Sequence, residues 1–247
     1  MPGRKGSLQA EIQAAARRHG RLVYPLPAEP PALHAALSHG TPVLVFQNLG
    51  LDWFPRWHYA VLIGLDPAAR TAVLHTGTER AHATPLTAFL ATWDRAGRWA
   101  RAVLAPDRVP VFAEADTWLR AAVELESSGQ PAAARRAYAA ATHRWPAHAP
   151  AWALLGNAEY AAGQPAAALE AYRESLRLAP AQPGVRNNRA YVLAELGCRA
   201  RAEAEIAAAR SVAGPEWRDR LDETVAEIGA MPVRGCPLAE GDGPDPR

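Results

Sequence analysis

Apolar positions in residues 1–108 follow a strand period in some segments and a helix period in others. Residues 42–46 and 59–65 are short apolar runs with β-branched residues, which is typical of buried strands. Residues 86–93 place apolar side chains at i, i+3, i+4 and i+7, which predicts a helix that ends at Gly97. The pattern predicts further helices after Ser7 and from Pro30, and further strands at residues 22–24, 71–74, 79–83 and 99–104. This order of elements predicts an α+β domain with a mostly antiparallel sheet.

From about residue 110 onward, the pattern becomes Ala-rich, helical in period and repetitive. A set of large, small and proline residues recurs 34 positions later. The first set is Trp118, Gly129, Ala134, Tyr138 and Pro146, and the second is Trp152, Gly163, Ala168, Tyr172 and Pro180. A third set continues with Gly197 and Ala202. A fixed period of this kind is typical of stacked helix pairs that bury a continuous core.

The period is that of the tetratricopeptide repeat, and the pair Leu155 and Gly156 also resembles its motif. We expect the repeated small residues to let paired helices approach closely and the large ones to fill the gaps between pairs. Pro146 and Pro180 are expected to end the second helix of each pair. An unrelated Ala-rich helical bundle is the structural alternative. The expected repeats are at about residues 115–148, 149–182 and 183–216, and a cap helix completes an all-α solenoid over residues 114–230.

Three repeats make a short concave surface, and we expect this surface to bind a peptide or a partner protein. The alternative is that the repeats only brace the first domain. Residues 231–247 have the composition of turns and are predicted to form a disordered tail.

Composition narrows the classes of partner. The chain has 27 Lys and Arg against 25 Asp and Glu, and the formal net charge of +2 is too small to indicate nucleic acid or an anionic membrane as a main partner. No apolar run approaches the roughly 18 residues of a membrane span. No signal peptide is visible, and the compartment is undetermined. Cys198 and Cys236 lie in dissimilar contexts and predict neither a disulfide framework nor a metal site.

His58 is the main candidate for chemistry because it opens the apolar strand predicted at residues 59–65. A thiol peptidase uses a histidine as proton carrier, together with a cysteine of lowered pKa. It also needs a polar group that orients the imidazole and donors for the oxyanion. No cysteine precedes His58 in the chain. A structural histidine at a strand edge is the alternative.

Three stretches carry a resemblance to a known family: residues 6–9, residues 42–50 and residues 57–66. On these motifs, residues 1–108 resemble the double-glycine (bacteriocin-processing) peptidase-like group of papain-like cysteine peptidases. The layout as a whole resembles a bacterial subfamily in which such a domain precedes tetratricopeptide repeats. The resemblance covers most of residues 1–230.

The resemblance implies that His58 is the catalytic histidine of an incomplete papain-like domain. Family members carry the nucleophilic cysteine on an N-terminal helix, with a glutamine shortly before it, and both are missing here. We therefore expect a misassigned start and a domain that begins one helix late. The third catalytic position, usually Asp or Asn, holds His75, which we keep as the candidate that orients the imidazole. Gln47, Asn48 and Trp57 are expected to line the substrate cleft.

Two hypotheses about function follow. The first is a cysteine peptidase family protein with peptide-binding repeats, which is N-terminally truncated and inactive as written. The alternative is a non-catalytic tetratricopeptide-repeat scaffold or adaptor with a degenerate peptidase-like domain. Neither hypothesis requires a metal or a cofactor. Without the missing helix, an apolar sheet face should be exposed, which makes a dimer one expected consequence. The resemblance also implies that full-length relatives are exported.

Overall fold

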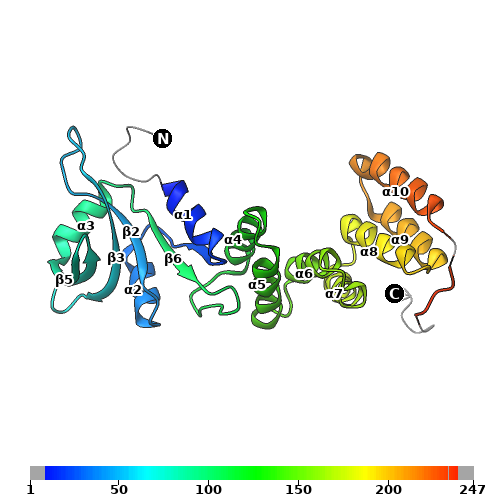
Figure 1. The fold of residues 1–247 in the computed structure, drawn as a ribbon, viewed down its shortest axis with the longest axis horizontal. Helices are drawn as coiled ribbons and strands as arrows, with labels where there is room; N and C mark the ends of the chain where they lie inside the picture. The colour runs from blue at the N-terminus through cyan, green and yellow to red at the C-terminus, as the bar shows by residue number, and fades with distance from the viewer. Residues whose placement is uncertain (1–8, 233, 239–247) are drawn as a thin grey trace. The chain divides into compact units, whose positions relative to one another are not determined.

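The computed structural model describes residues 9–232 and 234–238 (Figure 1). The chain forms two compact units, one in residues 1–137 and one in residues 138–247. The helix start expected at Ser7 lies outside the described residues, as does most of the first stretch that carries the family resemblance.

Within the described residues, the N-terminal unit holds a six-stranded antiparallel sheet in the order β1-β6-β2-β3-β4-β5. The strands are β1 (Leu22–Pro25), β2 (Val43–Asn48), β3 (Trp57–Asp66), β4 (Thr71–Thr76), β5 (Glu79–Pro85) and β6 (Ala100–Leu104). The helices are α1 (Gln9–Arg18), α2 (Pro30–Ser38), α3 (Leu86–Asp94), α4 (Ala115–Ser127) and the first part of α5 (Pro131–Arg144). The predicted α+β order and the mostly antiparallel sheet are confirmed.

One face of the sheet carries the core of this unit. Alternate residues of β2 and β3, such as Val43 and Leu62, are fully buried there. α2 and α3 pack on the same strands and contribute Leu33, Phe89 and Trp93, which are also fully buried. The strands and helices share one core because the period-2 alternation puts every second side chain on the same side of the sheet.

The opposite face is aromatic and only partly covered. Phe46 stacks on Trp57 with ring centroids 5.2 Å apart, and it also contacts Tyr59, which meets Trp99 edge-on. α1 lies on this side, where one of its side chains accepts a hydrogen bond from Arg101 Nε. The dimer expected from an exposed apolar face stays a prediction.

α4, the first helix of the expected repeats, packs against β1 of the sheet. Glu114, the residue before α4, donates its backbone N–H to the Tyr24 hydroxyl at 2.9 Å. Arg17 of α1 also forms an ion pair with Glu124 of α4. The boundary between the compact units therefore lies within α5 rather than at the change in composition near residue 110.

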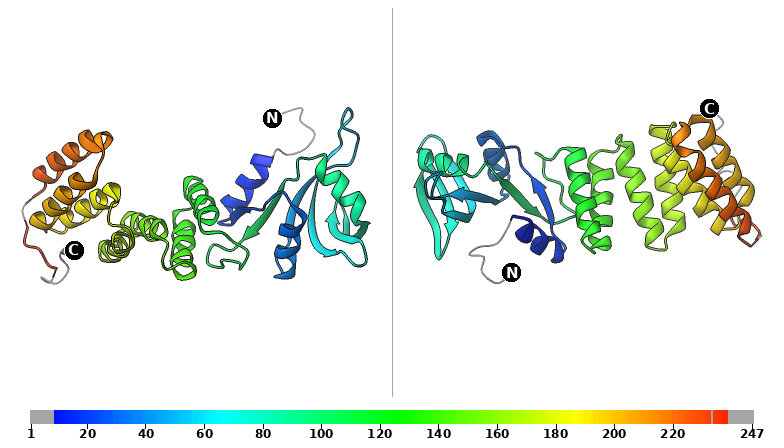
Figure 2. Two further views of the ribbon diagram at one scale, coloured as in Figure 1. Left: turned by 180° about the vertical axis from the view of Figure 1, so that it is seen from behind. Right: turned by 90° about the horizontal axis from the view of Figure 1, so that it is seen from above.

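The C-terminal unit is helical and continues the repeat pattern. After the last part of α5 it holds α6 (Ala149–Ala161), α7 (Pro165–Leu178), α8 (Pro183–Glu195), α9 (Arg199–Val212), the 3-10 turn η1 (Pro215–Trp217) and α10 (Arg218–Ala230). α6 packs with α7, α7 with α8, and α8 with α9, while α10 packs on both α8 and α9 (Figure 2). The helical, tetratricopeptide-like repeats predicted from the 34-residue period are confirmed.

The repeated small residues have two different roles. Ala134, Ala168 and Ala202 are fully buried, as expected for close helix packing. Gly129 and Gly163 instead lie in the turns between paired helices, with φ of 80° and 72°, and a Cβ at either position would meet nothing within 4 Å. The expectation that these two glycines allow close packing is wrong. They are required for a left-handed turn conformation, which glycine adopts without strain.

Close approach occurs instead at Gly156 in α6. A Cβ at this position would lie 2.5 Å from two ring carbons of Tyr172 in α7. Tyr172 is only 1 % exposed, and its hydroxyl donates a hydrogen bond to Asn157 Oδ1 at 2.8 Å. The backbone of Gly156 therefore contacts the ring of Tyr172, and Asn157 binds its hydroxyl. The packing of α6 on α7 depends on the absence of a side chain at Gly156.

Substitution of Gly156 should destabilise the C-terminal unit. Gly156→Ala is expected to lower the free energy of unfolding by about 1–3 kcal/mol, because the buried ring has no space to move into. Gly229→Ala in α10 is the control, since an added Cβ there meets nothing within 4 Å. The higher helix propensity of alanine should make this control neutral or stabilising by up to about 1 kcal/mol. Urea denaturation followed by circular dichroism measures both, and equal effects would contradict the packing role.

Candidate functional site

The candidate catalytic residues lie on β2, β3 and β4, and the strand register determines which of them meet. His58 of β3 pairs with Gln47 of β2. The His58 Nε2 atom is hydrogen-bonded to Thr76 Oγ1 at 2.6 Å. Gln47 Nε2 donates a hydrogen bond to Thr92 Oγ1 of α3, also at 2.6 Å. The side chains of Gln47, His58 and Thr76 therefore share the sheet face that α3 covers, and Gln47 is bonded to that helix.

His75 is placed on the other face of the sheet. The pairing of β3 with β4 puts Thr76 on the same face as His58, and successive residues of a strand point to opposite faces. His75 Nδ1 instead accepts a hydrogen bond from the backbone N–H of Ala81 at 3.1 Å. The expectation that His75 orients the His58 imidazole is therefore wrong, and the Thr76 hydroxyl holds that place.

Trp57 and Asn48, two of the three residues expected to line the substrate cleft, instead make contacts that stabilise the fold. Trp57 lies on the face opposite to His58, where it is 56 % exposed and stacked on an aromatic neighbour. Asn48 is 1 % exposed, and its Oδ1 atom accepts hydrogen bonds from two backbone N–H groups of the β2–β3 loop, both at 2.9 Å. Asn48 thereby closes that loop. Among the candidates, Gln47 and His58 are the pair that the structure brings together on one face.

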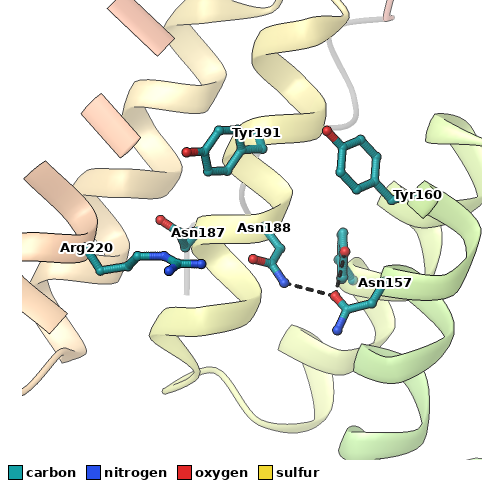
Figure 3. Close-up of a pocket in the computed structure, with 7 residues that line it drawn as sticks. Asn157, Tyr160, Asn187, Asn188, Tyr191 and Arg220 are labelled. Carbon is teal, nitrogen blue, oxygen red and sulfur yellow. Dashed lines mark hydrogen bonds between the residues drawn. The ribbon is translucent and has the colours of Figure 1, made fainter. Parts of the chain in front are cut away.

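A groove on the C-terminal unit is lined mainly by α6, α8 and α10 (Figure 3). Its volume is about 400 Å³. We call it the amide groove, and its lining residues are Asn157, Tyr160, Tyr172, Asn187, Asn188, Tyr191 and Arg220. A second cavity of about 590 Å³ adjoins it and shares Asn187, Asn188 and Arg220 with it.

Hydrogen bonds fix the orientation of the asparagine side chains in the amide groove. Asn157 Oδ1 accepts hydrogen bonds from the Tyr172 hydroxyl at 2.8 Å and from Asn188 Nδ2 at 2.9 Å. Asn187 Oδ1 accepts one from the buried Thr224 hydroxyl at 2.8 Å. Because an amide oxygen has two lone pairs, the two bonds to Asn157 leave its NH2 group as the part that a ligand can use.

Tyr160 and Tyr172 of the groove are held in the neutral form. The Tyr160 hydroxyl donates a hydrogen bond to Glu195 Oε1 at 2.8 Å. Burial raises the pKa of Tyr160 to about 12, and the hydrogen bond to Glu195 contributes to the rise. Burial also raises the pKa of Tyr172. Among the described residues that line the groove, Arg220 alone carries a charge.

Repeat periodicity identifies Tyr172 but none of the asparagines of the groove, because the repeating positions are those that pack helices together. A weaker signal is present in the sequence nevertheless. Asn187 and Asn188 are adjacent in α8, and asparagine has a low helix propensity because its side chain competes for backbone hydrogen bonds. Two adjacent asparagines within a helix therefore indicate that their side chains bind other groups rather than stabilise the helix.

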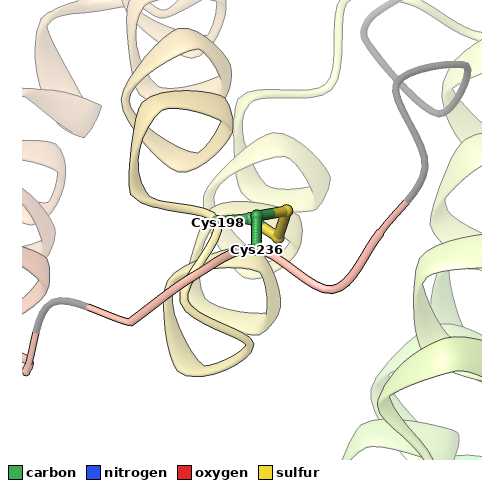
Figure 4. The surroundings of a disulfide bond; sticks show 2 residues. All are labelled: Cys198 and Cys236. Atoms are coloured by element: carbon green, nitrogen blue, oxygen red, sulfur yellow. A yellow bond between two sulfur atoms is a disulfide. The ribbon is translucent and has the colours of Figure 1, made fainter.

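The two cysteines form a disulfide, with the Cα atoms of Cys198 and Cys236 4.4 Å apart (Figure 4). Cys198 is the residue before α9, so the bond ties the segment after α10 to the start of that helix. Arg234 of this segment lies so close to Gly197 that a Cβ on the glycine would contact it at 2.9 Å. The expectation that the two cysteines do not pair is therefore wrong.

The segment predicted to be disordered from residue 231 is partly packed. Met231 and Leu238 contact the buried apolar cluster formed by α8, α9 and α10. Arg199 also donates hydrogen bonds to the carbonyl oxygens of Gly229 and Met231. Residues 239–247 lie outside the described residues, so disorder stays a prediction for them.

Two further features are absent from the part of the chain that the structure describes. No group of three or more His, Cys, Asp and Glu side chains there is placed to hold a metal ion. No helix in the same residues is long and apolar enough to cross a membrane.

Residues 119–183 match the family model of the tetratricopeptide repeat. This match runs from α4 to the first residue of α8. No curated protein matches the chain in sequence.

Among solved structures, the chain is similar to the Yersinia enterocolitica type III secretion chaperone SycD in complex with a peptide of the translocator YopD. The identity is 20 %, the likeness covers 46 % of this chain and 91 % of that chain, and the TM-score is 0.43. An alternative dimer of SycD gives 21 % identity, 47 % and 91 % coverage and a TM-score of 0.44.

Reduction of the disulfide should destabilise the C-terminal unit. The bond joins residues 38 positions apart. Its loss is expected to lower the free energy of unfolding by about 2–4 kcal/mol, because the unfolded chain regains conformational freedom. Urea denaturation with and without dithiothreitol measures the change. Cys236→Ser should be as unstable as the reduced protein and should not respond to the reductant, and equal stability of the oxidised and reduced wild type would contradict this expectation.

Proposed function

We propose that the chain is a protein-binding scaffold whose tetratricopeptide repeats hold a peptide segment of a partner protein in the amide groove. The observation that carries this proposal is the set of oriented amides on α6 and α8. Asn157 and Asn188 are joined by a hydrogen bond, and Asn157 is held in turn by the buried Tyr172. Side chains fixed in this way can bind a ligand without first losing rotamer freedom, which favours affinity.

The polar lining favours an extended segment over a helix. An extended peptide presents an unsatisfied N–H and C=O at each residue, and side-chain amides can pair with both. A bound helix satisfies its own backbone and docks through an apolar face, which requires an apolar groove. The polar residues of the amide groove match the first kind of ligand, while Tyr160 and Tyr191 provide flat surfaces for its side chains.

Selection of displayed random peptides on the oxidised full-length protein tests the proposal. Enriched peptides should bind Asn188→Ala about fivefold more weakly than the wild type, because a hydrogen bond from the groove is lost. Arg177→Gln is the matched control, since Arg177 lies on α7 and is exposed and paired with Glu174. It should bind like the wild type. A failure to enrich any peptide would contradict the scaffold function, and equal binding by Asn188→Ala would place the site elsewhere.

For the N-terminal unit, we propose a non-catalytic, peptidase-like domain. The family resemblance and the neighbouring Gln47 and His58 support a peptidase-like origin. The partner of His58 is the neutral Thr76 hydroxyl rather than a carboxylate, which supports the loss of catalysis. A thiol mechanism also requires a thiolate, and both cysteines of the sequence are joined in a disulfide.

The oxidised chain is therefore expected to show no thiol-dependent peptide hydrolysis. Release of fluorescence from labelled casein, measured with and without iodoacetamide, checks this expectation. The control is the double variant Cys198→Ala plus Cys236→Ala, which should give the same background rate. Hydrolysis that disappears in His58→Ala would contradict the non-catalytic assignment.

A further inference from the structure

Large apolar side chains are exposed together at the loop between β2 and β3. Among the described residues, ten large apolar side chains are exposed, and five of them lie within residues 49–57, which we call the apolar loop. The other five are valines at separate places in the chain. Single apolar residues on a surface are ordinary, whereas a contiguous group indicates an interaction site. The five in the apolar loop are Leu49, Leu51, Trp53, Phe54 and Trp57.

The apolar loop projects from the sheet. The hairpin that joins β2 to β3 extends beyond the strands and beyond α3 in both side views (Figure 1 and Figure 2). Trp53 is 81 % exposed, and its ring centroid lies 6.2 Å from that of Phe54. The loop therefore presents a narrow, convex, apolar surface.

The backbone of the apolar loop is hydrogen-bonded within the hairpin. Leu51 and Phe54 exchange backbone hydrogen bonds of 3.2 and 3.1 Å, and the Leu49 N–H donates to the Arg56 carbonyl at 2.9 Å. The buried Asn48 side chain accepts two further backbone N–H groups. An unpaired backbone group is costly away from water. These internal bonds lower the cost of moving the loop into an apolar medium.

The charges of the apolar loop cancel each other. Asp52 and Arg56 are its charged residues, and both are exposed. A loop without net charge does not favour nucleic acid or a strongly anionic surface. A charged carboxylate is also costly in the hydrocarbon of a bilayer, so Asp52 restricts the loop to the level of the lipid headgroups. Tryptophan is favoured at that level because its ring is apolar while its N–H can bond to water or headgroups.

We infer that the apolar loop inserts into the headgroup region of a lipid bilayer and holds the N-terminal unit on the membrane surface. A bilayer requires no complementary shape and takes up exposed Trp, Phe and Leu side chains at its boundary. A standard protein interface takes about 20–30 residues from each partner, many more than the nine residues of the loop supply. The inference is independent of peptide binding by the repeats.

Flotation of the oxidised full-length protein with phosphatidylcholine vesicles in a density gradient tests the inference. The wild type should float with the vesicles and should still do so in high salt, because apolar burial rather than charge drives the binding. Trp53→Ala plus Phe54→Ala should bind roughly tenfold more weakly or worse, because two large apolar side chains no longer enter the bilayer. Val111→Ala plus Val225→Ala shortens two exposed apolar side chains outside the loop and should bind like the wild type.

Asp52→Asn is the sharper variant because a gain of binding is expected from it. Removal of the charge should let the loop enter the bilayer more deeply and strengthen binding by roughly fivefold. Asp107→Asn makes the same change at an exposed position outside the loop and should bind like the wild type. Vesicles should also shift the tryptophan fluorescence of the wild type to shorter wavelength, and Trp53→Phe should bind with a smaller shift. Circular dichroism should show that all variants fold normally.

The outcomes separate a lipid surface from other partners of the apolar loop. Absence of flotation by the wild type, or equal flotation by Trp53→Ala plus Phe54→Ala, would overturn the inference. A wild-type dimer that this variant dissociates in sedimentation velocity would also overturn it, because the loop would then bind a second copy. Flotation that is lost in the loop variant, strengthened in Asp52→Asn and unchanged in both controls is the result expected. None of these outcomes affects the proposed peptide binding.

Discussion

The contact between Gly156 and Tyr172 is the interaction on which both the packing and the groove of the C-terminal unit depend. The ring of Tyr172 lies against the backbone of Gly156, which sets the spacing of α6 and α7. A buried tyrosine hydroxyl needs a hydrogen-bond partner, and Asn157, the residue after Gly156, provides it. The same Asn157 oxygen then accepts a hydrogen bond from Asn188 on the next helix pair. A packing contact in the core thus determines the direction of an exposed amide.

The repeats could be predicted from the sequence because their packing positions recur. Each helix pair must bury the same kind of face against its neighbour, so residues such as Tyr138 and Tyr172 return at the same period and are both buried. The groove could not be predicted in this way. Asn187 and Asn188 have no counterparts among the aligned positions, and the direction of each amide depends on hydrogen bonds to other helices. The disulfide was equally hidden, because the pairing of Cys198 with Cys236 depends on the path of the chain after α10.

In the N-terminal unit, the apolar pattern predicted the strands and their succession along the chain, but neither the order of the strands in the sheet nor the placement of the candidate site. Successive side chains of a strand point to opposite faces, so a shift of one residue decides whether two groups can meet. Thr76 and His75 are neighbours in β4, yet Thr76 shares a face with His58 and His75 does not. A bulge in the β3–β4 pairing between Leu62 and Gly64 further changes the register along these strands. A prediction made from sequence spacing alone therefore selects His75 as the partner of His58, whereas the strand register selects Thr76.

The last helix shows how a capping element acquires a second role. A terminal helix of a solenoid mainly covers the apolar end of the stack, and Leu221 and Ile228 of α10 do so from fully or almost fully buried positions. The same helix also buries Thr224, a polar residue that must be hydrogen-bonded. Thr224 meets this requirement through Asn187 of α8, which orients that amide, and Arg220 one turn earlier is thereby brought to the groove. The groove is complete only when α10 is docked, so the helix that closes the core also supplies the charge of the binding surface.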